Sequence, residues 1–159
     1  MSPFEKDFLD AALHQVGLPY LWAARGDWAV RDTAIVTTES LGCDHLAFDC
    51  SGLVTWAAYR AGAVDLRHWW GADSLFRRLP DPEPDALALV FYGPRARATH
   101  VAIELRRGVV LEAAGGDETT LTYVDAAKRG ARVRVGIDRR ADRLGVRSVL
   151  ALKSLTPRP

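Results

Sequence analysis

Residues 48–54 read Phe-Asp-Cys-Ser-Gly-Leu-Val, and the rest of the chain is best understood outward from this stretch. Asp49 and Ser51 are residue types that cap helix N-termini, and the apolar run after them is compatible with a helix. A helix that begins near Cys50 would place the sulfur at the positive end of the helix dipole, which favours the nucleophilic thiolate. A lone cysteine in such a position is more often a small buried apolar residue, so a catalytic role for Cys50 needs support from elsewhere in the chain.

The composition describes an ordinary globular protein. The chain has 159 residues and is expected to form a single domain over residues 1–159. Its net charge of +1 argues against a dedicated nucleic-acid-binding protein. No apolar run approaches the roughly 20 residues needed to span a membrane, and the first residues lack the pattern of a signal peptide. We therefore expect a protein made in the cytoplasm with reduced thiols.

The two cysteines, Cys43 and Cys50, do not form a disulfide framework. A bridge between them is compatible with their spacing, but it would consume the candidate nucleophile. Cys43, Asp44 and His45 together with Cys50 suggest a metal site, yet no second Cys/His pair completes a tetrahedral set at a familiar spacing. We expect neither a metal nor a cofactor.

The first half of the chain has a helical pattern, interrupted by one long connection. We expect helices at 3–16, 50–61 and 72–78, with an extended segment at 18–22. Residues 23–48 are expected to form a loop folded over the surface near Cys50, in which only 34–36 resemble a strand. The pair Trp69-Trp70 before the third helix is either core packing or the lining of a substrate groove.

The second half of the chain has the pattern of antiparallel strands. Strands are expected at 87–92, 99–105, 109–113, 131–135 and 145–152, with a short helix at 124–129. The arginine-rich stretch 128–147 is expected to form solvated strand faces and loops. Helices followed by antiparallel strands predict an α+β fold, with the N-terminal helices packed on a central antiparallel sheet.

A base for the nucleophile is expected in the first hairpin of these strands. His100 lies in that hairpin, where the backbone geometry is fixed, whereas the other histidines are expected to be structural or exposed. With Gly108 near the turn, residues whose numbers sum to about 212 or 214 would face each other. Glu112 would then be a cross-strand neighbour of His100 on one sheet face, within side-chain reach. A carboxylate in that position would orient the imidazole. Cys50, His100 and Glu112 therefore form the predicted catalytic set.

The same residues resemble a known family. The segments 18–22 (Leu-Pro-Tyr-Leu-Trp), 48–54, 100–103 (His-Val-Ala-Ile) and 110–113 (Val-Leu-Glu-Ala) resemble the NlpC/P60 cysteine peptidases in order and spacing. The resemblance covers roughly residues 15–115, and the later region is similar to phage-type members. It implies a pared-down papain-like fold and hydrolysis of peptidoglycan stem peptides, typically between γ-D-glutamate and a diamino acid.

Carried over residue by residue, the resemblance also implies roles for individual side chains. Cys50 is the nucleophile, His100 is the base and then the acid, and Glu112 is the orienting group. Tyr20 matches a family tyrosine whose hydroxyl lies near the nucleophile and assists the oxyanion. Three further residues are expected to contact substrate: Asp49, Ser51 and Trp22.

The chain departs from the family pattern in three places. Ala23-Ala24 stands where the family usually has Gly-Gly, and Leu87-Ala88 stands where a strand usually begins Gly-Asp. The third catalytic position is more often His, Asn or Gln than Glu. Two other functions are compatible with the residues: an amidase or acyltransferase that uses the same Cys-His pair, and a catalytically silent component for wall binding or assembly. The partners implied are stem peptides at the cell wall, reached with phage or secretion-system components, or imported peptides in the cytosol.

Overall fold

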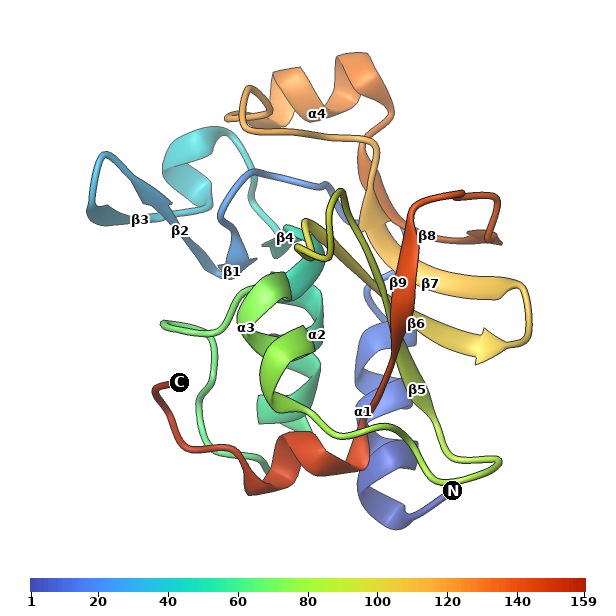
Figure 1. Ribbon diagram of the computed structural model, residues 1–159. Coiled ribbons are helices and arrows are strands. Elements are labelled where there is room, and N and C mark those ends of the chain that lie inside the picture. Colours follow the sequence, from blue (N-terminus) through green and yellow to red (C-terminus); the bar gives the residue numbers. More distant parts are fainter.

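A computed structural model describes residues 1–159, which form a main antiparallel sheet with helices packed on it and two smaller ribbons (Figure 1). The sheet has five strands in the order β8-β7-β6-β5-β9, and every neighbouring pair is antiparallel. The strands are β5 (Ala88–Tyr92), β6 (His100–Arg106), β7 (Val109–Ala114), β8 (Arg132–Ile137) and β9 (Arg143–Ser148). The predicted α+β fold is confirmed.

The helices that cover the sheet come mainly from the first half of the chain. They are α1 (Pro3–Leu13), α2 (Cys50–Arg60), α3 (Ala72–Arg78) and, from the second half, α4 (Tyr123–Arg129). Helix α2 packs against β6 and β7, and α1 packs against α2. Their apolar faces and one face of the sheet bury a shared core that includes Phe8, Leu53, Leu89, Ile103 and Leu111. No helix is long and apolar enough to cross a membrane.

The N-terminal helix is tied to the sheet through a buried carboxylate. Glu5 is 3% exposed and forms a capping box with Ser2, whose backbone N–H donates to it at 2.7 Å. Its other carboxylate oxygen accepts the backbone N–H of Leu87 at 3.1 Å. Burial opposes the charge on Glu5, but these hydrogen bonds outweigh it and lower the pKa of the carboxyl group.

The segment between α1 and α2 is more structured than the sequence predicted. It contains two small antiparallel ribbons: β1 (Arg25–Gly26) pairs with β4 (Ala47–Phe48), and β2 (Trp28–Arg31) pairs with β3 (Ala34–Thr37). A 3₁₀ turn, η1 (Glu39–Leu41), follows β3. The prediction of a plain loop over 23–48 is therefore wrong. These strands are too short to show a period-two pattern in the sequence.

Two predicted boundaries also differ from the structure. Helix α1 ends at Leu13 instead of Val16, because the chain turns there to give the Gly17 N–H to the carbonyl of Val133 in β8. The last predicted strand, 145–152, is strand only as far as Ser148. Residues Leu150–Ser154 form a 3₁₀ helix, η2, which buries Leu152. A short apolar run can be buried from either conformation, so the pattern alone does not decide between them.

Candidate active site

Cys50 is the first residue of α2, and its neighbours hold this helix end in place. The side chain of Asp49 caps the helix by accepting the Gly52 backbone N–H at 2.6 Å. A Cβ atom at Gly52 would lie 2.1 Å from the carbonyl oxygen of Ala24, so only glycine allows this approach. That carbonyl also accepts the Asp49 N–H at 3.0 Å. The Cys-Ser-Gly sequence thus fixes the helix end directly against the chain around Ala24.

His100 and Glu112 form the second part of the site, on the central strands of the sheet. His100 Nε2 lies 2.6 Å from Glu112 Oε2, and both side chains are 11% exposed. This contact leaves Nδ1 as the ring nitrogen available to Cys50. Burial opposes a charge on His100, but the interactions with Cys50 and Glu112 outweigh it and raise the pKa of His100 to about 9. A cationic imidazole beside the sulfur is the partner that a nucleophilic thiolate requires.

The contact between His100 and Glu112 is diagonal across the two strands. Ile103 pairs with Leu111 and Glu104 with Val110, so the same ladder continued brings Ala102 opposite Glu112. The observed ladder is one of the two registers expected, and in it His100 and Glu112 are diagonal neighbours and not directly opposite. A register shift between Glu104 and Arg106 displaces the ladder at the hairpin end. The two side chains are long enough to meet across the diagonal.

Glu112 has a second partner that the sequence reasoning missed. Arg134 lies directly opposite Glu112 on β8, and its Nη2 is 3.4 Å from Glu112 Oε1. Burial opposes the charge on Glu112, but the contacts with His100 and Arg134 outweigh it and lower the pKa of the carboxyl group. Glu112 therefore stays ionised between a histidine and an arginine. The alternating pattern of β8 was the only sequence signal for this contact.

Tyr20 is buried and lines the same site. Its side chain packs on Gly116, where a Cβ atom would lie 2.2 Å from the tyrosine ring. Burial, followed by the charges of Asp49 and Cys50, raises the pKa of the Tyr20 hydroxyl. The hydroxyl is therefore protonated at neutral pH and able to donate a hydrogen bond.

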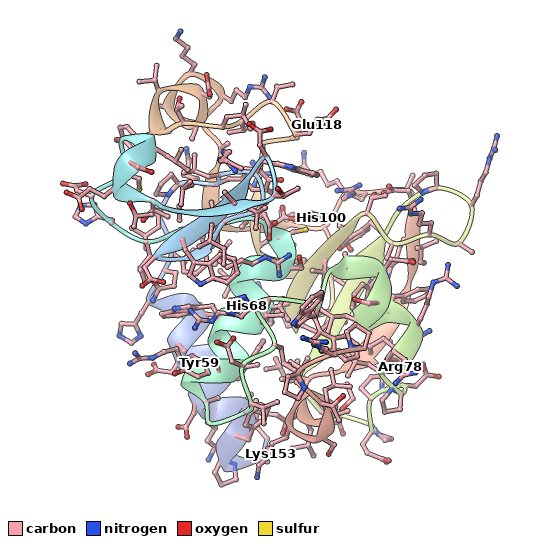
Figure 2. The ribbon with its side chains drawn as sticks, turned by 90° about the vertical axis from the view of Figure 1, so that its left-hand side faces the viewer. Tyr59, His68, Arg78, His100, Glu118 and Lys153 are labelled. Carbon is pink, nitrogen blue, oxygen red and sulfur yellow. The ribbon has the colours of Figure 1, made fainter.

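These residues line one groove with a volume of about 1180 Å³. Its lining includes all the predicted site residues: Tyr20, Trp22, Asp49, Cys50, Ser51, His100 and Glu112. Trp22 is 43% exposed, whereas Asp49 and Ser51 are buried at the base of α2. In Figure 2, Glu118 lies above His100 at the α4 end of the molecule.

Several arginines in the groove lining were not predicted as site residues. Arg25 lies 3.8 Å from Asp49 and donates to the carbonyl of Trp70 at 2.8 Å. Arg134, Arg139 and Arg140 also line the groove, and all three are exposed, as expected for the strand faces and loops of stretch 128–147. Long-range contacts of single arginines leave no local sequence pattern that could have identified them.

The remaining candidates lie outside the groove. Trp70 is buried in the core, and Trp69 is exposed and stacks with Arg158, so this pair does not form part of the groove lining. Cys43 is a buried free thiol that donates to the carbonyl of His45 at 3.3 Å. Cys50 is also a free thiol, so no bridge joins the two cysteines.

Comparison with known proteins places this geometry in a family. The NlpC/P60 family description matches residues 17–134, which include the helix with Cys50 and the strands with His100 and Glu112. The chain belongs to the NlpC/P60 family. The resemblance read from the sequence motifs is thereby confirmed.

Individual NlpC/P60 relatives are mycobacterial. The chain is 34% identical over 102 residues to the peptidoglycan endopeptidase RipA of Mycobacterium tuberculosis. The aligned region covers 64% of this chain and 20% of RipA. The chain therefore spans about one fifth of the length of that curated relative. The solved structure of the peptidoglycan hydrolase RipB from the same organism has a TM-score of 0.62 at 25% identity, covering 92% of this chain and 64% of that one.

A third NlpC/P60 relative shows that the fold alone does not establish catalysis. RipD of Mycobacterium tuberculosis is described as a non-catalytic NlpC/P60 domain protein adapted to peptidoglycan binding. Its structure has a TM-score of 0.61 at 23% identity, covering 92% of this chain and 96% of that one. Activity in this family therefore depends on the side chains of the site and not on the fold alone.

Proposed function

We propose that this chain is a cysteine endopeptidase that hydrolyses an amide bond in peptidoglycan stem peptides. The observation that carries the proposal is the set Cys50, His100 and Glu112 in one groove, with His100 bound to Glu112 at 2.6 Å. This set supplies a nucleophile, a base and an orienting group in the order that covalent catalysis requires. The substrate class follows from the relatives named as peptidoglycan endopeptidase and hydrolase.

The proposed reaction begins at the sulfur of Cys50. Its thiolate attacks the amide carbonyl and forms a C–S bond while the carbonyl oxygen becomes an oxyanion. The Cys50 backbone N–H stands at the first helical position and has no protein acceptor, and with the Tyr20 hydroxyl it supplies donors for this oxyanion. The cationic His100 then protonates the leaving nitrogen as the C–N bond breaks.

The second half of the reaction releases the acyl group. The neutral His100 takes a proton from water, whose oxygen attacks the thioester carbon. The C–S bond breaks, the carboxylic acid product leaves, and the proton on His100 restores the pair with Cys50. Glu112 stays ionised throughout and holds the imidazole, since its pKa is lowered by the same contact.

The proposed bond joins γ-D-glutamate to a diamino acid. On this proposal Asp49 and Ser51 meet the free amine end of the stem peptide, and Trp22 covers the peptide at the groove edge. Support comes from the place of all three in the groove lining.

The experiment compares Cys50→Ala with a matched cysteine variant, Cys43→Ser. Purified stem peptides and whole sacculi are digested, and the products are identified by mass spectrometry. Cys50→Ala is expected to lose at least about 10³-fold in turnover, because the nucleophile is removed. Cys43→Ser keeps the donor to the His45 carbonyl and is expected to retain activity. Full activity in Cys50→Ala would refute the assignment of the nucleophile.

The same digests separate the alternative functions. An acyltransferase would form an adduct when an acceptor amine is added, whereas a hydrolase would give the free acid. A silent wall-binding component would give no product with the unaltered chain. It would also leave Cys50 unlabelled by iodoacetamide at mildly acidic pH, where labelling requires a stabilised thiolate.

A further inference from the structure

The groove that contains Cys50 has opposite charges at its two ends. Beside Tyr20 lie the carboxylates of Asp49, Asp117 and Glu118, and Glu118 has no ion-pair partner. Asp117 is paired with Arg129 at 2.6 Å and Asp49 with Arg25 at 3.8 Å, so this end retains a small negative excess.

The other end of the groove lies beyond His100 and has an excess of positive charge. Its two carboxylates are already paired, Asp73 with Arg77 at 2.7 Å and Asp138 with Arg143 at 3.4 Å. Arg97 from the β5–β6 loop and Arg139 from the β8–β9 loop both line the groove, and both are exposed with no salt bridge or side-chain hydrogen bond. Arg140 also lines the groove, but its charge is paired with Asp142 at 2.9 Å. Its guanidinium lies 4.8 Å from the Tyr92 ring centroid, and that ring lies 5.7 Å from the ring of His100. Two unpaired guanidinium groups therefore flank the side of the groove next to the catalytic histidine.

The chemistry of the site decides which half of a substrate meets these cations. His100 protonates the leaving nitrogen, so the leaving half of the substrate must emerge on the His100 side of Cys50. We infer that Arg97 and Arg139 bind a free carboxylate on the leaving half of the substrate, close to the scissile amide. Guanidinium groups match carboxylates in geometry as well as in charge. The inference rests on the proposed function and adds to it a requirement for an anionic leaving half.

The test measures binding separately from catalysis, with the chain carrying Cys50→Ala. Two synthetic stem peptides are used, identical except that the leaving residue carries either free carboxylates or carboxamides. Calorimetry is expected to give an affinity about 10-fold higher for the carboxylate peptide, in keeping with a partly exposed, charge-assisted contact. Adding Arg97→Ala or Arg139→Ala is expected to reduce this preference to about 3-fold or less.

Arg95→Ala is the matched control. Arg95 lies in the same loop as Arg97 and is exposed, but it does not line the groove. Its removal changes the net charge equally and is expected to leave the 10-fold preference intact. Equal affinity for both peptides, no binding of either, or a preference that survives both groove variants would overturn the inference.

Cleavage by the chain with Cys50 intact is measured in parallel. If that chain binds the carboxylate peptide selectively and does not cut it, the proposed function fails while the carboxylate site stands. If it cuts both peptides equally well and binds them equally, the proposed function stands and the carboxylate site fails.

Discussion

Replacing Ala23 by glycine is expected to stabilise the protein. Ala23 has φ 55°, a left-handed conformation that costs a residue with a Cβ atom about 1–2 kcal/mol. Glycine removes this strain but loses about 0.5–1 kcal/mol more backbone entropy on folding. The net gain in the free energy of unfolding is therefore about 0.5–1 kcal/mol, which raises the Tm by about 1–4 °C in a chain of this size.

Ala24→Gly is the matched comparison, one residue along. Ala24 is fully buried and does not have a positive φ. Its substitution loses a buried methyl group, worth about 0.8 kcal/mol, together with the entropy cost of glycine. We expect the free energy of unfolding to fall by about 1.5 kcal/mol and the Tm to fall by about 3–6 °C.

Urea unfolding followed by tryptophan fluorescence, together with calorimetry, measures both variants. The two neighbouring substitutions are expected to change the free energy of unfolding in opposite directions. A loss of stability in Ala23→Gly as large as that in Ala24→Gly would show that the left-handed conformation carries no strain. Ala23 and Ala24, which stand where the family usually has Gly-Gly, would then respond alike to substitution by glycine.

Three further substitutions test other contacts. Gly52→Ala should lower the free energy of unfolding by more than about 2 kcal/mol, since the new Cβ would meet the carbonyl oxygen of Ala24. The control Gly136→Ala, whose Cβ would meet nothing within 4 Å, should change it by less than about 0.5 kcal/mol. Equal effects of the two substitutions in urea unfolding would contradict the close approach of Gly52 to Ala24. Glu112→Gln removes a charge that raises the pKa of His100. The alkaline limb of the pH profile of kcat/KM should therefore move from about pH 9 to lower pH, with at least a 10-fold loss of rate at neutral pH. An alkaline limb that does not move would show that Glu112 does not influence the titration of His100. Glu5→Gln should lower the free energy of unfolding by about 1–2 kcal/mol at neutral pH. This difference from the wild type should vanish as the pH falls through the lowered pKa of Glu5, because the carboxylate stabilises the fold only while it is ionised. A difference that does not depend on pH in acid unfolding would show that the charge of Glu5 does not stabilise the fold.

The sequence was most informative where a local rule governs the structure. Helix α2 begins at Cys50 because Asp49 caps it, and that capping preference is visible in the sequence. Helix α4 likewise ends at Gly130, which takes the left-handed conformation at the C-terminus. The contact of His100 with Glu112 was predictable because a hairpin brings strand neighbours together from a known turn.

Contacts between distant segments were not predictable in this way. The register shift near Glu104 changes which residues are opposite one another, and no residue type announces it. Arg25 reaches Asp49 only because β1 and β4 form a two-residue ladder, which is too short to produce a sequence pattern. The cations of the β8–β9 loop enter the groove because of sheet order, which is a property of the whole chain.

The chain of contacts from His100 through Glu112 to Arg134 crosses the sheet from an inner strand to its edge. His100 is on β6, with a strand on either side, and Arg134 is on the edge strand β8, where its side chain is 46% exposed. Substitutions at exposed edge positions usually change stability little, whereas buried central positions tolerate few residues. Of His100, Glu112 and Arg134, Arg134 is therefore the residue that evolution can exchange most freely. A lineage could retune the acid–base behaviour of its histidine from the sheet edge without rebuilding the core that holds the nucleophile in place.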